Sequence, residues 1–397
     1  ITESGDLAIT GVTTLVAGSN AITLDRTGNN FQAAVIVTSG GNVQLVDAGA
    51  IELGASTVTG TYAVTATSGD ITADSGALII TGASTFKTVA NGSDIELDYA
   101  THAFSNSVTL KAGSGGGGTF GDITFVDSEG AVDLDSSASA NGDLYIDAST
   151  DGAVGGTLSI KANGVITQNV DLAVTGITTL EAGGNAITLN RAGNNFQDEV
   201  RVTSGGNVQL VDAGAIELGA STVTGTYAVT ATSGDITADS GALIITGAST
   251  FKTVANGSDI ELDYATHAFS NSVTLKAGSG GGGTFGDITF VDSEGAVDLD
   301  SSASANGDLY IDASTDGAVG GTLSIKANGV ITQNVDLAVT DATTLEAGSN
   351  AITLNRSGND FQDAVIVTSG GDVALRDTNA IELGASTVTG TYSVTAG

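Results

Sequence analysis

One long tandem repeat dominates the sequence. The stretch from Val37 to Val165 recurs without a single change as Val202 to Val330. Copies open at Ile1, Ile166 and Ile331, so the 397 residues hold about 2.4 repeats. A structure grows by such copying when each new copy stacks on the last, which closed globular cores do not allow. We therefore divide the chain into repeat 1 (1–165), repeat 2 (166–330) and a partial repeat 3 (331–397), and we expect one continuous rod.

Each repeat is itself a diverged duplication. The segment that opens at Ile1 aligns with the segment that opens at Ile71, and Phe31 matches Phe104. The second half of the repeat is the longer one. This hierarchy of copies again favours a stacked structure.

Short alternating runs identify the element that is stacked. In VQLVD from Val43, IELDY from Ile95 and ITFVD from Ile123, apolar residues stand two apart with polar residues between them. This is the period of a β-strand with one buried face. Clusters of Gly, Asn, Asp and Ser separate the runs, and no stretch has a helical period. The chain is therefore predicted to be all-β.

The spacing of the runs favours a parallel β-helix, a β-solenoid, of about seven coils per repeat. Coils are expected to begin at Ile1, Ala21, Val43, Ile71, Ile95, Ile123 and Leu144, with right-handed winding as the default. The absence of Pro agrees, because Pro would remove a ladder hydrogen bond from each strand that held it. The residues expected to face the core are Val43, Leu45, Ile51, Leu53, Ile95, Leu97, Ile123, Phe125, Leu144 and Ile146.

Composition excludes several classes of function. There is no Cys, so disulfides, thiolate metal sites and cysteine nucleophiles are absent. The net charge of −34 repels nucleic acid and anionic lipid surfaces. No apolar run is long enough to insert into a membrane. The single His of each full repeat, His102 or His267, is expected to be a corner residue that packs on aromatic rings.

The segment from Ile166 to Thr222 resembles the repeats of giant bacterial exoproteins. The most distinctive pieces are NAITLNRAGNNFQ from Asn185, VTSGGNVQLVD from Val202 and AIELGASTVTG from Ala215. They are similar to filamentous haemagglutinin-like, or β-strand-repeat, proteins, which are often exported by two-partner secretion. The resemblance implies an extracellular or cell-surface bacterial location and a shaft without catalytic residues.

The sequence thus predicts a structural segment of a long secreted or surface fibre: an adhesin shaft, a surface filament or an extracellular matrix component. Its expected partners are further repeats, or copies of itself bound head to tail, because open coil ends are unpaired strand edges. A glycan or a host surface is a further possible partner. The alternative function is a glycan- or receptor-binding solenoid, which requires a surface cluster among Tyr62, Phe86, Tyr99, Phe104, Phe120, Phe125 and Tyr145.

Carboxylates are the only plentiful chemical groups. The best candidate calcium ligands are Asp143, Asp147 and Asp151, which stand four apart, and the alternative is a solvated acidic face. Apart from calcium no cofactor is expected. The pairs within Asp94, Glu96 and Asp98, and Asp133 with Asp135, raise the possibility of a polysaccharide-processing enzyme. Such an enzyme would need a groove that joins carboxylates of adjacent coils with a Lys or Arg. We do not expect an enzyme, because active sites are singular and these residues recur unchanged 165 positions later.

Overall fold

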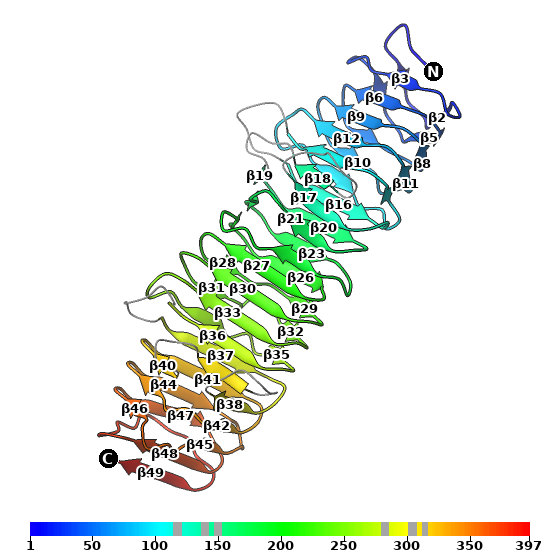
Figure 1. The fold of residues 1–397 in the computed structure, drawn as a ribbon. Coiled ribbons are helices and arrows are strands. Elements are labelled where there is room, and N and C mark those ends of the chain that lie inside the picture. Colours follow the sequence, from blue (N-terminus) through cyan, green and yellow to red (C-terminus); the bar gives the residue numbers. More distant parts are fainter. Residues whose placement is uncertain (114–120, 136–142, 147–152, 279–285, 301–307, 312–316) are drawn as a thin grey trace. The chain divides into compact units, whose positions relative to one another are not determined.

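A computed structural model describes the chain except for residues 114–120, 136–142, 147–152, 279–285, 301–307 and 312–316 (Figure 1). Every regular element in the described ranges is a β-strand. Strands of successive turns pair in parallel, which makes a β-solenoid of about 16 turns. The prediction of a parallel β-helix is confirmed, and its handedness stays a prediction. The described residues contain no helix long and apolar enough to span a membrane.

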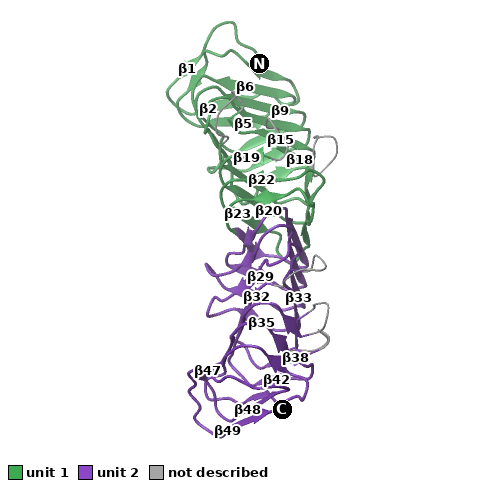
Figure 2. Cartoon of the chain, turned by 90° about the vertical axis from the view of Figure 1, so that its left-hand side faces the viewer, with its two compact units in different colours: residues 1–199 green, residues 200–397 purple. Residues whose placement is uncertain are grey.

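The chain forms two compact units, residues 1–199 and 200–397 (Figure 2). In each unit one sheet takes a strand from every coil, and we call it the first face. A second sheet, the second face, runs along another side. Short sheets of two or three strands complete the coils.

The first face of unit 1 holds nine strands, in the spatial order β3 (Ile22–Leu24), β6 (Val43–Asp47), β9 (Tyr62–Ala66), β12 (Ser84–Thr88), β15 (Val108–Lys111), β18 (Asp143–Ile146), β17 (Val132–Asp135), β21 (Ile166–Gln168) and β24 (Ile187–Leu189). The second face holds β7 (Ile51–Glu52), β10 (Ile71–Thr72), β13 (Ile95–Leu97), β16 (Ile123–Asp127), β20 (Leu158–Ala162) and β23 (Thr178–Glu181). The short sheets are β1 (Ala8–Ile9) with β4 (Asn30–Phe31), β2 (Thr13–Val16) with β5 (Val35–Ser39), β8 (Ser56–Val58) with β11 (Leu78–Ile80) and β14 (Ala103–Phe104), and β19 (Ala153–Val154) with β22 (Ala173–Val174) and β25 (Asn195–Phe196).

Unit 2 repeats this arrangement. Its first face holds β27 (Val208–Asp212), β30 (Tyr227–Ala231), β33 (Ser249–Thr253), β36 (Val273–Lys276), β39 (Asp308–Ile311), β38 (Val297–Asp300), β42 (Ile331–Gln333), β45 (Ile352–Leu354), β48 (Val373–Asp377) and β49 (Tyr392–Ala396). Its second face holds β28 (Ile216–Glu217), β31 (Ile236–Thr237), β34 (Ile260–Leu262), β37 (Ile288–Asp292), β41 (Leu323–Ala327), β44 (Thr343–Glu346) and β47 (Val365–Ser369). The remaining strands are β26 (Val200–Ser204), β29 (Ser221–Val223), β32 (Leu243–Ile245), β35 (Ala268–Phe269), β40 (Ala318–Val319), β43 (Ala338–Val339) and β46 (Asp360–Phe361).

One strand per repeat is out of sequence order. In unit 1, β18 follows β17 in the chain, yet it pairs with β15 on one side and with β17 on the other. In unit 2, β39 lies in the same way between β36 and β38. The expectation that a coil begins at Leu144 is therefore wrong, since β18 is an inserted strand and the coil begins with β17.

Other predicted coil starts are also displaced, although the number of coils per repeat holds. The strands at Ile71, Ile95 and Ile123 lie on the second face, whereas those at Ala21 and Val43 lead into the first. On the first face the coils of one period begin at Ile22, Val43, Tyr62, Ser84, Val108, Val132 and Ile166. The shortest of these coils begins at Val43 and the longest at Val132, because the inserted strand lengthens the latter.

The core is a column of side chains inside the coils. All ten residues predicted to face it are buried, with at most 2% of their surface exposed. Aromatic rings contact one another through it from coil to coil. Tyr62 and Phe86 meet edge to face with their centroids 5.8 Å apart, and Phe104 and Phe125 stack with their centroids 5.3 Å apart. Fully burying one such side chain stabilises a fold by about 1.5–3 kcal/mol. The stack therefore ties neighbouring coils together.

Buried carboxylates complete the backbone hydrogen bonding at the corners. Asp47 is fully buried, and its two oxygens accept the backbone N–H groups of Phe31 and Gly49 at 2.6 Å each. In the other half of the repeat Asp127 accepts those of Phe104 and Glu129. Because corner N–H groups have no ladder partner, such an acceptor removes the cost of burying them.

Candidate functional site

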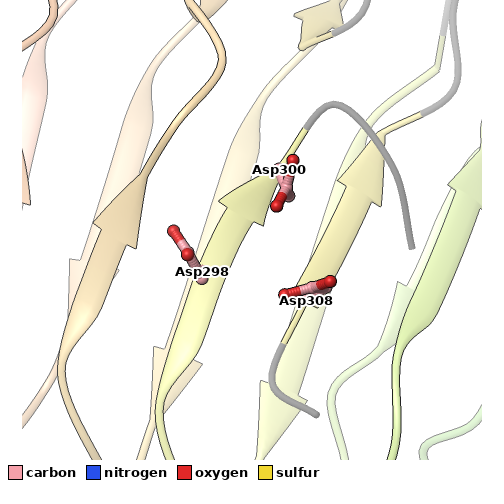
Figure 3. A group of neighbouring side chains, drawn as sticks. All are labelled: Asp298, Asp300 and Asp308. Atoms are coloured by element: carbon pink, nitrogen blue, oxygen red, sulfur yellow. The ribbon is translucent and has the colours of Figure 1, made fainter. Parts of the chain in front are cut away.

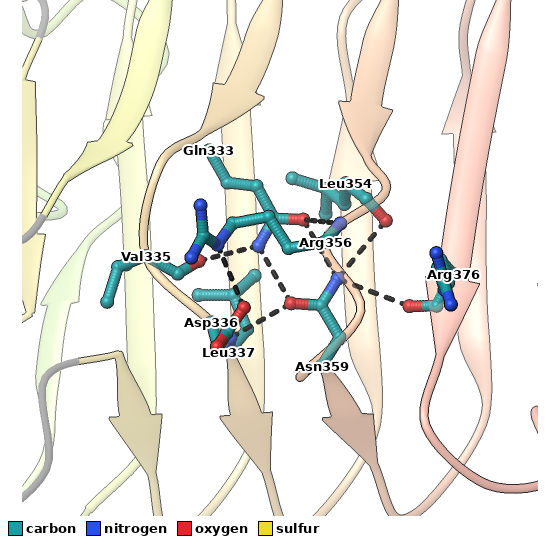
Figure 4. A network of polar contacts seen from close by, with 8 residues as sticks. All are labelled: Gln333, Val335, Asp336, Leu337, Leu354, Arg356, Asn359 and Arg376. Atoms are coloured by element: carbon teal, nitrogen blue, oxygen red, sulfur yellow. Dashed lines mark hydrogen bonds and ion pairs between the residues drawn. The ribbon is translucent and has the colours of Figure 1, made fainter. Parts of the chain in front are cut away.

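A buried polar network joins neighbouring coils at one corner of each repeat. In repeat 3 the Asn359 Oδ1 accepts the backbone N–H of Leu337 at 3.0 Å and the Gln333 amide at 2.8 Å (Figure 4). Its own amide nitrogen donates to Gln333 and to the carbonyls of Leu354 and Arg376. Such a fully bonded amide fixes the register between coils. The network is structural, since its polar atoms bond to one another.

Histidine occupies the matching corner in the longer half of the repeat. His102 is fully buried, its Nδ1 accepts the N–H of Leu78 at 2.9 Å, and its Nε2 lies 2.9 Å from the carbonyl of Ala73. These partners select the neutral ring with the proton on Nε2. Burial lowers the pKa of His102, and it lowers the pKa of His267 to about 4. The prediction of a corner residue that packs on aromatic rings is confirmed, because the ring centroids of Tyr99 and Phe104 each lie 6.0 Å from that of His102.

A row of carboxylates runs along the entrance to the second face. The Asp70 Oδ1 accepts the backbone N–H of Asp94 at 2.9 Å, and the Asp94 Oδ1 accepts that of Asp122 at 2.7 Å. Asp122 does the same for Thr157. Partial burial and then the neighbouring carboxylates raise the pKa of Asp94, and the pKa of Glu96 rises for the same reasons. Each of these three aspartates accepts a backbone N–H of the following coil, so their carboxylates have a structural role.

The predicted calcium ligands fall largely outside the described part of the chain. Asp143 begins β18, but its side chain is not described, and Asp147 and Asp151 lie in the segment 147–152. Repeat 2 carries the same sequence, and there Asp308, the equivalent of Asp143, is described and buried. The other two equivalents, Asp312 and Asp316, lie in the segment 312–316.

The inserted strand brings together carboxylates that are distant in the sequence. Asp298 and Asp300 lie on β38 and Asp308 on the adjacent β39, with one oxygen from each within 4.8 Å of the others (Figure 3). They are the equivalents of Asp133, Asp135 and Asp143. The sequence alone predicts the first two as a possible catalytic pair and the third as a calcium ligand.

This triad could hold a divalent cation. Three carboxylates offer up to six oxygens, the ligand type that Ca²⁺ prefers, although Thr332 Oγ1 donates to one oxygen of Asp298 at 2.9 Å. Strand pairing, which the sequence spacing did not reveal, creates the group. The calcium expectation itself stays a prediction.

Most of the aromatic residues named for a surface platform lie inside. Tyr62, Phe86, Phe104 and Phe125 are at most 4% exposed, whereas Tyr99 is 37% exposed. Tyr145 is half-buried, and Phe120 lies in the segment 114–120, outside the described residues. An aromatic platform therefore does not form among the four buried rings.

A polar groove was not foreseen. Its lining in unit 2 includes Asp292, Lys326 and Glu346, from the adjacent strands β37, β41 and β44. Carboxylates of neighbouring coils thus meet a lysine, which is the arrangement that a solenoid enzyme would need. Lys326 and Glu346 pair directly, with the Nζ and an Oε 2.8 Å apart. Only the stacking of three coils assembles this set.

The sequence matches a family described as repeats of unknown function (DUF5649), over residues 1–38, 40–111, 116–203, 205–276, 286–368 and 370–397. The chain belongs to this family. Two matched segments recur in each period of the repeat, 40–111 with 116–203 and then 205–276 with 286–368, in agreement with the internal duplication. No curated protein and no solved structure matches the chain. The match to this repeat family does not test the resemblance to filamentous haemagglutinin-like proteins, which stays a prediction.

Proposed function

We propose that the chain is a structural segment of a long secreted or cell-surface fibre. The carrying observation is the unchanged recurrence of a long repeat within a parallel β-solenoid. Each coil bonds mainly to the coils before and after it, so an added repeat meets the same surroundings as the existing ones. A length set by repeat number is useful to a fibre and has no evident use in a closed globular protein.

The charge supports the same function. A net charge of −34 keeps a long solenoid soluble and opposes side-to-side association of exposed strands. The location we propose is the bacterial cell surface or the extracellular space, as an adhesin shaft, a surface filament or a matrix component. Catalysis is not part of this proposal, since the corner networks and buried acids are bonded within the fold.

Changing the number of repeats tests the structural part. Deletion of residues 166–330 joins Val165 to Ile331, which recreates the natural Val330–Ile331 junction. With coils stacked about 4.8 Å apart, the seven coils of a repeat contribute roughly 34 Å. Small-angle X-ray scattering should therefore give a maximum dimension about 34 Å shorter for the deletion and about 34 Å longer for a variant with one added repeat.

The maximum dimension of a compact globular protein grows with the cube root of its mass. A maximum dimension that changed only by that amount would contradict the proposal. Location needs its own test, because a solenoid can also serve inside a cell. Immuno-electron microscopy with antibodies to this chain should label surface or extracellular fibres with a regular axial repeat. Label confined to the cytoplasm, or on discrete particles, would refute the fibre.

A further inference from the structure

A groove opens at one corner of unit 2, where three second-face strands end side by side. Its volume is about 500 Å³, within the ~300–1,000 Å³ typical of small-molecule sites. Val291, Ala327 and Ala347 give it a small apolar lining, and polar side chains supply the rest. It therefore has the size and the mixed surface of a ligand site.

The polar lining has hydrogen-bonding capacity that the described fold does not use. The side-chain amide of Asn328 and the hydroxyl of Ser349 make no hydrogen bond within the described part of the chain. Asn350 donates to the carbonyl of Ala347 at 3.0 Å, which leaves its Oδ1 as an acceptor. Lys326 and Glu346 add a charged donor and a charged acceptor beside one another. The groove thus offers donors and acceptors in close alternation.

Charge narrows the class of ligand. Lys326 and Glu346 neutralise each other, and Asp292 adds one buried carboxylate. An anionic ligand would meet this carboxylate inside a chain that already carries −34. A neutral ligand that is rich in hydroxyl groups can use the alternating donors and acceptors and rest its C–H groups on the alanines.

We propose that this groove binds a neutral saccharide. Among the described residues no aromatic side chain lines it, so binding through a few hydrogen bonds should be weak, with a Kd on the order of 1 mM. One groove per repeat would give a fibre many such sites, and many weak sites bind a polysaccharide firmly. Weak single sites are therefore compatible with a role in surface attachment.

Repeat 1 offers a natural comparison. It keeps Lys161, Glu181 and Asn163 in the equivalent places, with the Lys161 Nζ and a Glu181 Oε 2.6 Å apart. There the Asn163 amide donates to the Ser128 carbonyl at 3.1 Å. Gly184 occupies the position equivalent to Ser349, so the Ser349 hydroxyl has no counterpart beside repeat 1. A Cβ on Gly184 would meet no atom within 4 Å. The variant Gly184→Ser therefore adds the hydroxyl without disturbing the coil.

The test is saturation-transfer NMR and titration of the whole chain with N,N′-diacetylchitobiose and maltotriose as neutral probes and a hyaluronan tetrasaccharide as the anionic probe. At least one neutral probe should bind, and the hyaluronan should not. The double variant Asn328→Ala/Ser349→Ala should weaken binding about tenfold or more. The control is Asn91→Ala/Ser19→Ala, at two exposed corners far from the groove in the sequence, and it should leave binding unchanged.

Three results would overturn the proposal: no binding of either neutral probe at 10 mM, preferential binding of hyaluronan, or undiminished binding by the Asn328/Ser349 variant. Gly184→Ser should raise the saturation signal, because repeat 1 then also carries the hydroxyl that Ser349 supplies. An unchanged signal would overturn the part assigned to the Ser349 hydroxyl. All of these variants change exposed residues, so circular dichroism should show the same β-structure throughout.

Discussion

Acidification from pH 7 to pH 5 should loosen the corner that His267 holds together. The ring is fully buried and neutral, with the Leu243 N–H donating to Nδ1 at 2.9 Å and the Ala238 carbonyl 2.9 Å from Nε2. Burial lowers its pKa to about 4, from the 6.5 of an unperturbed ring. The unfolded state therefore takes up a proton first as the pH falls, and stability is lost from about pH 6.5 down to about pH 4.

The size of the loss follows from the two pKa values. At pH 5 the imidazole is almost fully protonated in the open state and mostly neutral in the folded state. The free energy of opening is therefore lower by about 2 kcal/mol. The variant His102→Asn/His267→Asn removes the titration at both corners and keeps an acceptor for the Leu78 and Leu243 N–H groups. The chain itself uses Asn at the equivalent corners, where Asn194 and Asn359 accept the N–H groups of Leu172 and Leu337.

Hydrogen exchange measured by mass spectrometry gives a local readout on peptides that cover residues 238–250 and their identical copies at 73–85, which report on both histidine corners together. After correction for the intrinsic exchange rate, the free energy of opening should fall by about 2 kcal/mol in the wild type between pH 7 and pH 5. In His102→Asn/His267→Asn it should be lower at pH 7, because one hydrogen bond and some packing are lost at each corner, and nearly constant with pH. Peptides around Leu337 and Asn359 provide the internal control. An equal fall in wild type and variant would refute the reasoning.

Two other predictions concern carboxylates. Burial and the charges of Asp94 and Asp98 raise the pKa of Glu96, so Glu96→Gln should raise the Tm at pH 7 by roughly 1 °C, with the gain vanishing near pH 4, where Glu96 is itself protonated. Thermal melts test this, with Glu52→Gln as the control, and a lower Tm would contradict it. If the aspartate triad holds calcium, 1 mM Ca²⁺ should raise the Tm by about 1–3 °C over EGTA. Asp133→Asn/Asp298→Asn should abolish the rise, and identical melts of the wild type with Ca²⁺ and EGTA would refute the site.

Local pattern was enough to predict the strands and the core. Val43 and Leu45 alternate with polar residues, and this period is a property of neighbouring residues alone, so burial followed directly. The face on which a strand lies is different. The strands at Val43 and Ile95 have the same pattern, yet they belong to the first and the second face. Nothing in the alternation distinguishes the sides of a solenoid, so the coil starts were partly misplaced.

Polar contacts between coils were the least predictable feature. For Asn20, Asn42 and Asn91 the sequence leaves two possibilities open, stacked amides or misaligned, solvated side chains. In the structure the Asn20 amide donates to the Ala17 carbonyl and the Asn42 Oδ1 accepts the Thr61 N–H, both backbone groups. Asp70 and Asp94 form a regular row instead. Because loop lengths decide which corner residues stack, single corners in the sequence do not reveal their partners. The groove at Lys326 escaped prediction for the same reason.

The inserted strand has a consequence for the way the chain acquires its fold. A polypeptide that emerges N-terminus first can wind turn upon turn as far as β17. At that point β18 has to enter between β15 and β17, two strands that precede it in the chain. Winding cannot then proceed as a uniform zipper, and one intercalation step recurs in each full repeat. We expect this step to limit the folding rate, which would make the whole repeat, rather than the single turn, the unit in which the solenoid is assembled.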